Sequence, residues 1–258
     1  MVLNSRTFNS ECKEISGGNY LHLIDIETID SKLEKFLDES IVKICEGNVN
    51  TDLTIIKKRL IDYLTPKKGS TIEMGAIAEF FTHLYLNEIG FKQEFLFLNL
   101  EEGSIKKGFD GYYSLSGEEW IYESKSGSIN TAGISHDKKV KESYEDLKKK
   151  ISGKVANNPW QNAYHHANLI DVGSAEDLRK NLKKLSEEFT KKKYHDIKNF
   201  NIMPGSTIFL EGNWESVKSG DLENKIGELV SKFDFKRINV ICVNKKSLRL
   251  FWEYLEKK

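Results

Sequence analysis

Cysteine, long apolar runs and net charge are all scarce in this chain of 258 residues. Cys12, Cys45 and Cys242 are odd in number, lie far apart and form no Cys-x-x-Cys pattern, which argues against a disulfide framework and a structural zinc site. No apolar run approaches the ~20 residues that a helix needs to cross a bilayer. The first residues also lack the charged and apolar parts of a secretion signal. We therefore expect reduced thiols and a soluble, cytoplasmic protein.

The charges cancel overall, 39 Lys and Arg against 39 Asp and Glu, but they are spread unevenly. Residues 1–135 hold 14 basic against 21 acidic residues, a net of −7, whereas residues 136–200 hold 15 against 10, a net of +5. Lysines gathered on one surface make salt-sensitive contacts with the phosphates of any nucleic-acid sequence. The alternative is that lysines alternating with Glu142, Glu145 and Asp146 only solvate a helix face. The candidate nucleic-acid contacts are Lys138, Lys139, Lys148, Lys149, Lys150 and Lys154.

One constellation suggests chemistry: Asp110, followed by Glu123 and Lys125. The aromatic and β-branched residues 120–122 favour a strand around them. Alternate side chains of a strand share a face, so Glu123 and Lys125 are expected to point the same way. This spacing predicts a carboxylate and an ammonium group side by side on one rigid surface.

A metal-dependent phosphodiesterase needs these residue types together. Mg²⁺ takes carboxylate oxygens, keeps several waters, polarises a phosphoryl oxygen and lowers the pKa of a bound water. Asp110 and Glu123 are suited to hold Mg²⁺, with Mn²⁺ as an alternative, and Lys125 can orient the attacking water or stabilise charge at phosphorus. Two simpler explanations stay open. Asp110-Gly111 is also a type I′ hairpin signal, and a Glu-x-Lys pair on a strand is usually only a solvated face.

A helix is predicted over residues 72–89, after Ser70 or Thr71 as N-cap and before Gly90. Its apolar residues surround most of its circumference, which predicts burial. Glu79 lies within it, and a buried carboxylate needs a partner such as Lys125 or a metal. Alternatively, Glu79 shares a polar stripe with His83 and faces water.

The pattern is interrupted at residues 66–69, which we interpret as a boundary between an N-terminal segment, residues 1–68, and a domain over residues 69–258. The N-terminal segment is predicted to hold a strand near 20–26 and helices near 29–45 and 53–63. Because an acidic surface suits DNA poorly, we expect it to bind a protein partner.

The larger domain alternates strands and helices, which predicts an α/β fold with a mixed sheet flanked by helices. Trp160 and Tyr164, one helical turn apart, either stack on bases or pack under a loop, and we favour packing. Ser174 is the expected N-cap of a helix over 174–193. The other predicted elements are strands near 93–100, 108–115, 118–125, 206–210 and 237–243, and helices near 135–150 and 221–233.

With the Glu79 helix, the strands and the triplet in this order, the chain resembles the PD-(D/E)XK nuclease superfamily, the fold of many restriction endonucleases. In that fold a helix carries a Glu, a β-meander brings the motif Asp and the (Asp/Glu)-x-Lys together, and a second helix and a further strand follow. The resemblance implies a restriction-endonuclease-like core with an N-terminal α/β addition. It also implies that Asp110, Glu123 and Lys125 are catalytic, that Asp110 and Glu123 bind the metal, and that Glu79 is accessory. Phe109 stands where the motif has Pro.

Within that superfamily, Gly75-x-x-x-Glu79, Gly108-Phe109-Asp110-Gly111 and Tyr122-Glu123-Ser124-Lys125 look most like the HamA-type nucleases of Hachiman anti-phage defence systems, which act beside a helicase. The likeness spans roughly residues 70–215. It implies a bacterial, Mg²⁺-dependent deoxyribonuclease effector with DNA as substrate and a helicase as partner. A restriction-type endonuclease, an RNase of the same fold, and an inactive nucleic-acid-binding or scaffold protein stay open as alternatives, since a fold does not fix a function.

Overall fold

A seven-stranded mixed sheet forms the centre of the protein in a computed structural model that describes residues 5–98 and 108–257. Its strand order is β1-β2-β7-β6-β5-β4-β3. The four inner strands β2, β7, β6 and β5 are parallel, whereas β1, β4 and β3 pair antiparallel at the edges. The strands are β1 (Asn9–Ser16), β2 (Asn19–Ile26), β3 (Lys92–Gln93), β4 (Gly111–Leu115), β5 (Glu118–Ser128), β6 (Asn201–Phe209) and β7 (Arg237–Lys245).

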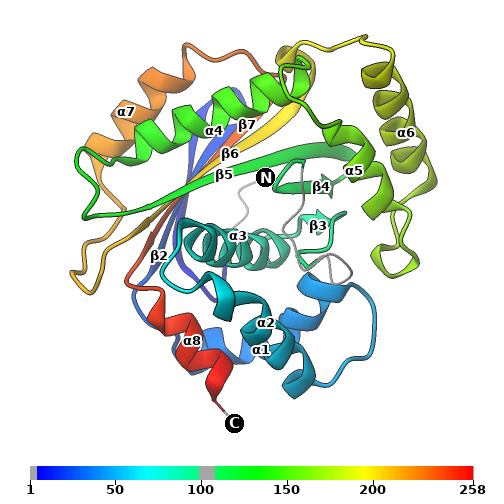
Figure 1. Ribbon diagram of the computed structural model, residues 1–258. Helices are drawn as coiled ribbons and strands as arrows, with labels where there is room; N and C mark the ends of the chain where they lie inside the picture. The colour runs from blue at the N-terminus through cyan, green and yellow to red at the C-terminus, as the bar shows by residue number, and fades with distance from the viewer. Residues whose placement is uncertain (1–4, 99–107, 258) are drawn as a thin grey trace.

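Helices cover both faces of this sheet (Figure 1). One face, called the α3 face below, packs against α1 (Ser31–Glu46), α2 (Leu53–Leu64), α3 (Thr71–Glu88) and α8 (Arg249–Glu256). The opposite face, called the α4 face, packs against α4 (His136–Ile151), α5 (Pro159–Ala167), α6 (Glu176–Thr190) and α7 (Gly220–Val230). Parallel neighbours need long crossovers, and α4–α6 join β5 to β6 while α7 joins β6 to β7. The predicted α/β class with a mixed, helix-flanked sheet is confirmed.

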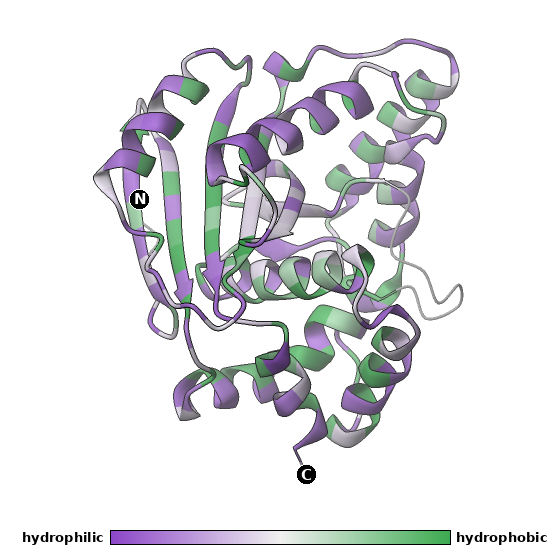
Figure 2. Cartoon of the chain, turned by 60° about the vertical axis from the view of Figure 1, so that its left-hand side comes forward, coloured by the Kyte–Doolittle hydropathy of each residue, from purple (hydrophilic) through white to green (hydrophobic). Residues whose placement is uncertain are grey.

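The central helix α3 forms where the sequence predicts it. Ser70 caps it by accepting a bond from the Glu73 N–H (3.3 Å), and Gly90, at φ +98°, follows its end. The helix is mostly white and green in Figure 2, whereas the outer helices carry long purple stretches. Its residues 76–86 are all buried, as expected for a helix that is apolar around most of its circumference.

Two local predictions are wrong, and packing explains both. Of the strand expected near 93–100, only Gln93 lies in a strand, β3 (Lys92–Gln93), because Phe95 turns into the core of the α4 face and Phe97 into that of the α3 face. Residues 99 and 100 of that range lie outside the described residues. Ser174 does not cap α6; its hydroxyl donates to Glu94 Oε2 (2.5 Å), and Ala175 precedes the helix.

Residues 5–68 of the N-terminal segment share their sheet and core with the rest of the described chain. β2 lies between β1 and β7, and α1 and α2 pack in one apolar cluster with α3. The break at residues 66–69 therefore separates two helices and does not separate two cores. Within the described ranges, no helix is both long and apolar enough to cross a membrane.

Trp160 packs inside, as favoured from its sequence. Its ring lies 4.9 Å, centroid to centroid, from Phe109 and 5.2 Å from Phe200. Phe109 is fully buried in the same cluster of the α4 face. This contact anchors the residue directly before Asp110, and so fixes where β4 begins.

Candidate active site

Asp110, the residue directly before β4, lies beside Glu123 of the neighbouring strand β5. Gly111 is paired with Tyr122 in the antiparallel register of β4 and β5, so Asp110 follows in line opposite Glu123. Asp110 Oδ2 accepts a hydrogen bond from the Ser124 N–H (2.8 Å), which holds this carboxylate against β5. The twelve residues between Asp110 and Glu123 form the tight β4–β5 hairpin.

The hairpin explanation for Asp110-Gly111 is wrong. The turn lies at Ser116 and Gly117, whose φ angles are +51° and +80°. Gly111 starts β4 instead, and a Cβ there would come within 2.7 Å of the Tyr113 ring. Glycine is therefore required by the close approach of that ring, and Asp110 stands at the start of a strand.

Glu123 is buried, with 2% of its surface exposed, so the solvated-face explanation fails for it. Its Oε1 lies 3.2 Å from Lys125 Nζ, and its Oε2 accepts a bond from Lys150 Nζ. Its backbone carbonyl accepts a bond from the Ser143 hydroxyl (2.6 Å) on α4. A buried carboxylate thus has both oxygens compensated by ammonium groups, as its burial requires.

Helix α4 supplies two charged residues that the sequence analysis did not assign to the site. Asp146 Oδ2 lies 2.7 Å from Lys125 Nζ, and Lys150 lies on Glu123. Ser143, Asp146 and Lys150 share one flank of α4, being three and four residues apart. A helical projection of the sequence places this flank beside the buried stripe of α4, but the strand that the flank faces is set by how α4 packs on the sheet.

The electrostatic balance of this cluster favours protonation of Glu123 near neutral pH. Burial raises the pKa of Glu123 to about 7, and Asp110 adds to the effect, while Lys150 and Lys125 oppose it. Burial alone would lower the pKa of Lys125, but Glu123, Asp146 and Asp110 together raise it. Lys125 therefore keeps its proton throughout the physiological range, and acts as a charge and donor.

Glu79 is buried on the α3 face, so the alternative that it faces water with His83 is wrong. Its charge affects the pKa values of two buried tyrosines of the sheet. Burial raises the pKa values of Tyr113 and Tyr122, and Glu79 and Asp110 both raise them further. The charges of Glu79 on α3 and of Asp110 before β4 therefore act on the same two buried tyrosines.

The donor set fits Mg²⁺ in its chemistry. Mg²⁺ is usually held by one or two carboxylates together with waters and substrate phosphates, and Asp110 and Glu123 offer two. Among residues 5–98 and 108–257, no three His, Cys, Asp or Glu side chains gather so that they could hold a metal. Glu79 therefore does not complete a three-carboxylate set, and further ligands would be water and phosphate.

The six candidate phosphate-binding lysines do not form one free basic patch. Lys139 pairs with Glu142 (2.7 Å), Lys148 approaches Asp234 (3.5 Å) and Lys149 approaches Asp146 (3.5 Å). Lys138 donates to the Gly133 carbonyl, and Lys150 is held at Glu123. Lys148, Lys149 and Lys154 line one groove of about 470 Å³ with His195 and three acidic residues.

Comparison with known proteins adds no relative: no protein-family model matches the chain, and no curated protein matches it significantly. The function must therefore be argued from the geometry of the site itself. That geometry is the buried Glu123 carboxylate of β5 with the partly exposed Asp110 and a protonated lysine beside it, where β4 meets β5 in an α/β fold.

Proposed function

We propose that this protein is a metal-dependent nuclease of the PD-(D/E)XK type, with a restriction-endonuclease-like core. The observation that carries the proposal is the convergence of Asp110, Glu123 and Lys125 from adjacent strands around a buried carboxylate. A structural ion pair would need only Glu123 and one lysine. Placing Asp110 beside Glu123, whose pKa is already raised to about 7, costs free energy. Carboxylates with pKa values perturbed in this way concentrate at functional sites.

Each residue has a distinct role in this proposal. Asp110 and Glu123 would hold Mg²⁺ or Mn²⁺, which when bound supplies an activated water and neutralises phosphate charge. The Ser124 N–H orients Asp110, and Ser143 fixes the backbone of Glu123. Lys125, protonated and aligned by Asp146, orients the attacking water and stabilises the charge that develops on the phosphate. Glu79 is accessory: its charge keeps Tyr113 and Tyr122, on which Asp110 also acts, from ionising.

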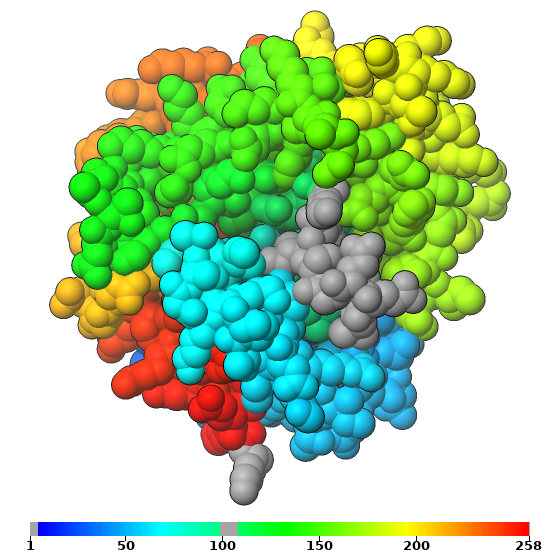
Figure 3. Space-filling view, viewed as in Figure 1, coloured from blue at the N-terminus to red at the C-terminus, as the bar shows by residue number. Residues whose placement is uncertain are grey.

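DNA is the proposed substrate, and the biological role is that of an effector in a bacterial anti-phage system that acts with a helicase. The surface is hollowed between the green segment that holds β5 and α4 and the cyan segment around the end of α2 (Figure 3). We propose that the nucleic acid enters there. RNA as substrate, a restriction-type endonuclease and an inactive binding protein remain the competing functions.

The test is cleavage of labelled DNA and RNA, side by side, with Mg²⁺, Mn²⁺ or EDTA. Glu123→Gln and Lys125→Met should each reduce metal-dependent DNA cleavage by ~10²-fold or more, as expected when a transition-state contact is lost. Glu142→Gln is the matched control, because Glu142 lies on α4 in an exposed pair with Lys139 outside the site. Normal cleavage by Lys125→Met with a folded protein would refute the assignment, and cleavage of RNA alone would change the substrate.

A helicase partner bound by the acidic N-terminal segment is part of the proposal. Since β2 is an inner strand, removing residues 1–68 would dismantle the sheet, so surface variants are the better tool. Glu39 and Asp62 are exposed on α1 and α2. If the partner binds there, Glu39→Lys with Asp62→Lys should weaken co-purification while isolated nuclease activity is unchanged. If the double variant binds the partner as the wild type does, the partner binds to another surface.

A further inference from the structure

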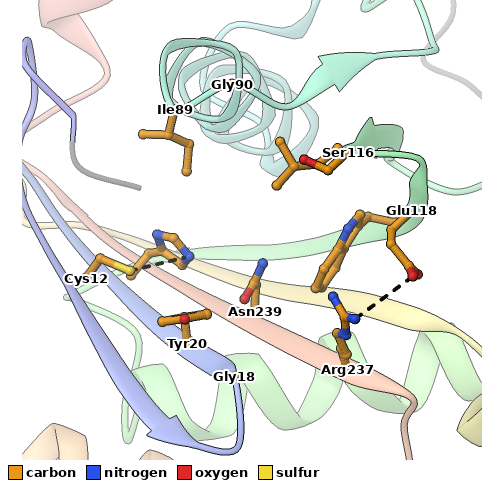
Figure 4. A pocket seen from close by; sticks show the side chains of 12 residues that line it. Cys12, Gly18, Tyr20, Ile89, Gly90, Ser116, Glu118, Arg237 and Asn239 are labelled. Atoms are coloured by element: carbon orange, nitrogen blue, oxygen red, sulfur yellow. Dashed lines mark hydrogen bonds and ion pairs between the residues drawn. The ribbon is translucent and has the colours of Figure 1, made fainter. Parts of the chain in front are cut away.

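A second cavity lies on the α3 face, away from Glu123. It has a volume of about 450 Å³, which is within the usual range for small-molecule sites. Its floor is made by the first residues of the parallel strands β2, β5 and β7, and its roof by Ile89 and Gly90 after α3 and by Ser116 of the β4–β5 turn (Figure 4). Trp120, on the floor, points to the opposite side of β5 from Glu123.

The floor of this cavity carries polar groups that lack partners. Asn239 and Trp120 are each only 4% exposed. Within the described part of the chain, Asn239 Oδ1 and Trp120 Nε1 have no hydrogen-bond partner. Buried polar groups in native proteins are nearly always paired, and these two atoms belong to residues that line the same cavity. Figure 4 shows Asn239 standing on β7 in the middle of the floor.

The cavity is aromatic across its floor and cationic at one end only. Tyr20 and Trp120 both line it, and flat rings of this kind hold planar heterocycles by stacking. Arg237 stands at the mouth, half exposed, and its nearest acid, Glu118, is 3.9 Å away. Glu118 is already held by Lys236 (2.8 Å) and Asn201 (2.9 Å), so it does not need Arg237.

The end opposite Arg237 is uncharged. His22 lines it, with its Nδ1 2.9 Å from the Tyr85 hydroxyl and its Nε2 3.9 Å from Cys12 Sγ. Burial lowers the pKa of His22 to about 4, so its ring is neutral. A ligand would therefore be oriented in this cavity, with its neutral end beside Cys12 and His22 and an anionic group at Arg237.

We propose that this cavity binds a nucleoside monophosphate, with the base between Tyr20 and Trp120, its edge on the Asn239 amide and its phosphate on Arg237. An amide pairs in two-pronged fashion with a ring edge that offers a donor beside an acceptor, as adenine does through N6 and N7. A guanidinium group matches phosphate oxygens in the same way. The proposal does not depend on the nuclease activity, since it uses none of the residues of that site.

The test is calorimetric titration of the intact protein with AMP, GMP, CMP, UMP, adenosine and inorganic phosphate. We expect AMP to bind best and phosphate alone not to bind measurably. Asn239→Leu should lower affinity for both AMP and adenosine at least tenfold. It should not lower the melting temperature, because it removes a buried amide oxygen, Oδ1, that has no hydrogen-bond partner among the described residues. Arg237→Gln should lower affinity for AMP at least tenfold, but leave adenosine within threefold of the wild-type value.

Lys232→Gln is the matched control for loss of one positive charge, since Lys232 is exposed on the surface and does not line the cavity. It should bind AMP as the wild type does. The proposal is overturned if no nucleotide binds, or if AMP binds Asn239→Leu and Arg237→Gln as tightly as the wild type. Equal loss of AMP binding in Lys232→Gln and Arg237→Gln would also overturn it, because a general charge effect would then suffice.

Discussion

Lys245, at the end of β7, is the most unusual charge in the fold and allows a quantitative test. It is completely buried on the α3 face, with Nζ 4.2 Å from the centroid of the Phe81 ring. Among the described residues, Nζ has no hydrogen-bond partner. An ammonium group in such a place is strongly disfavoured, and replacing Lys245 by Met keeps the unbranched shape while removing the charge.

The gain in stability expected from Lys245→Met follows from the pKa of Lys245. Burial lowers the pKa of Lys245 from 10.5 to about 7. Each pKa unit corresponds to about 1.4 kcal/mol, so charging Lys245 in the folded protein costs roughly 5 kcal/mol. The cation–π contact with Phe81 offsets up to about 2 kcal/mol of this. Lys245→Met should therefore stabilise the protein by roughly 3–5 kcal/mol at pH 6.

The pH dependence has a definite sign. Between pH 7 and 10.5 the unfolded chain holds a proton on Lys245 that the folded protein has released. The free energy of unfolding of the wild type therefore rises with pH in this range. The advantage of Lys245→Met should shrink through this window and vanish above it. Urea unfolding of both proteins at pH 6, 8 and 10 measures it, with Lys246→Met, a partly exposed neighbour, as control. An advantage independent of pH, or a loss of stability, would refute the reasoning.

Three further outcomes are expected. Lys150→Met should lower the Mg²⁺ concentration for half-maximal cleavage roughly tenfold at about pH 8.5, because a like charge within ~4 Å of the ion costs at least ~1 kcal/mol. An unchanged Mg²⁺ concentration would contradict the idea that Lys150 and Mg²⁺ compete for Glu123 Oε2. At limiting Mg²⁺, the cleavage rate should fall as the pH drops through about 7, where Glu123 takes up a proton, and a flat profile from pH 5 to 9 would contradict that pKa. Ser143→Ala should lower the free energy of unfolding by about 1–3 kcal/mol, since its hydroxyl joins the Glu123 carbonyl to the Gly205 N–H, and chemical denaturation measures this.

Local patterns predict the centre of this fold well because they are set by one element at a time. The all-round apolar pattern of α3 and the alternation around Glu123 follow from short-range rules, and both elements form where they are expected. The spacing between Asp110 and Glu123 contains its own hairpin, so even their pairing is local. The register of β4 and β5 therefore brings them together as the motif implies.

What could not be predicted depends on contacts between distant elements. Asp146 and Lys150 look like ordinary charges on an exposed helix until the face that α4 turns to β5 is known. The burial of Lys245 depends on α3 closing over the end of β7. Phe95 and Phe97 suggested a strand by composition, but the two cores on either side of the sheet draw them apart. Long-range packing overrides propensity in each case.

The position of β7 determines when the sheet can be completed during synthesis. The β1–β2 hairpin joins the other strands only through β7, where Tyr20 lies opposite Asn239. Chains emerge from the ribosome N-terminus first, so the hairpin must wait, with one edge of β2 unpaired, until Arg237–Lys245 has been made. Such long-range parallel pairing is slow. The open edge of β2 is a site where aggregation can start in the nascent chain, and where a chaperone would have most effect on yield.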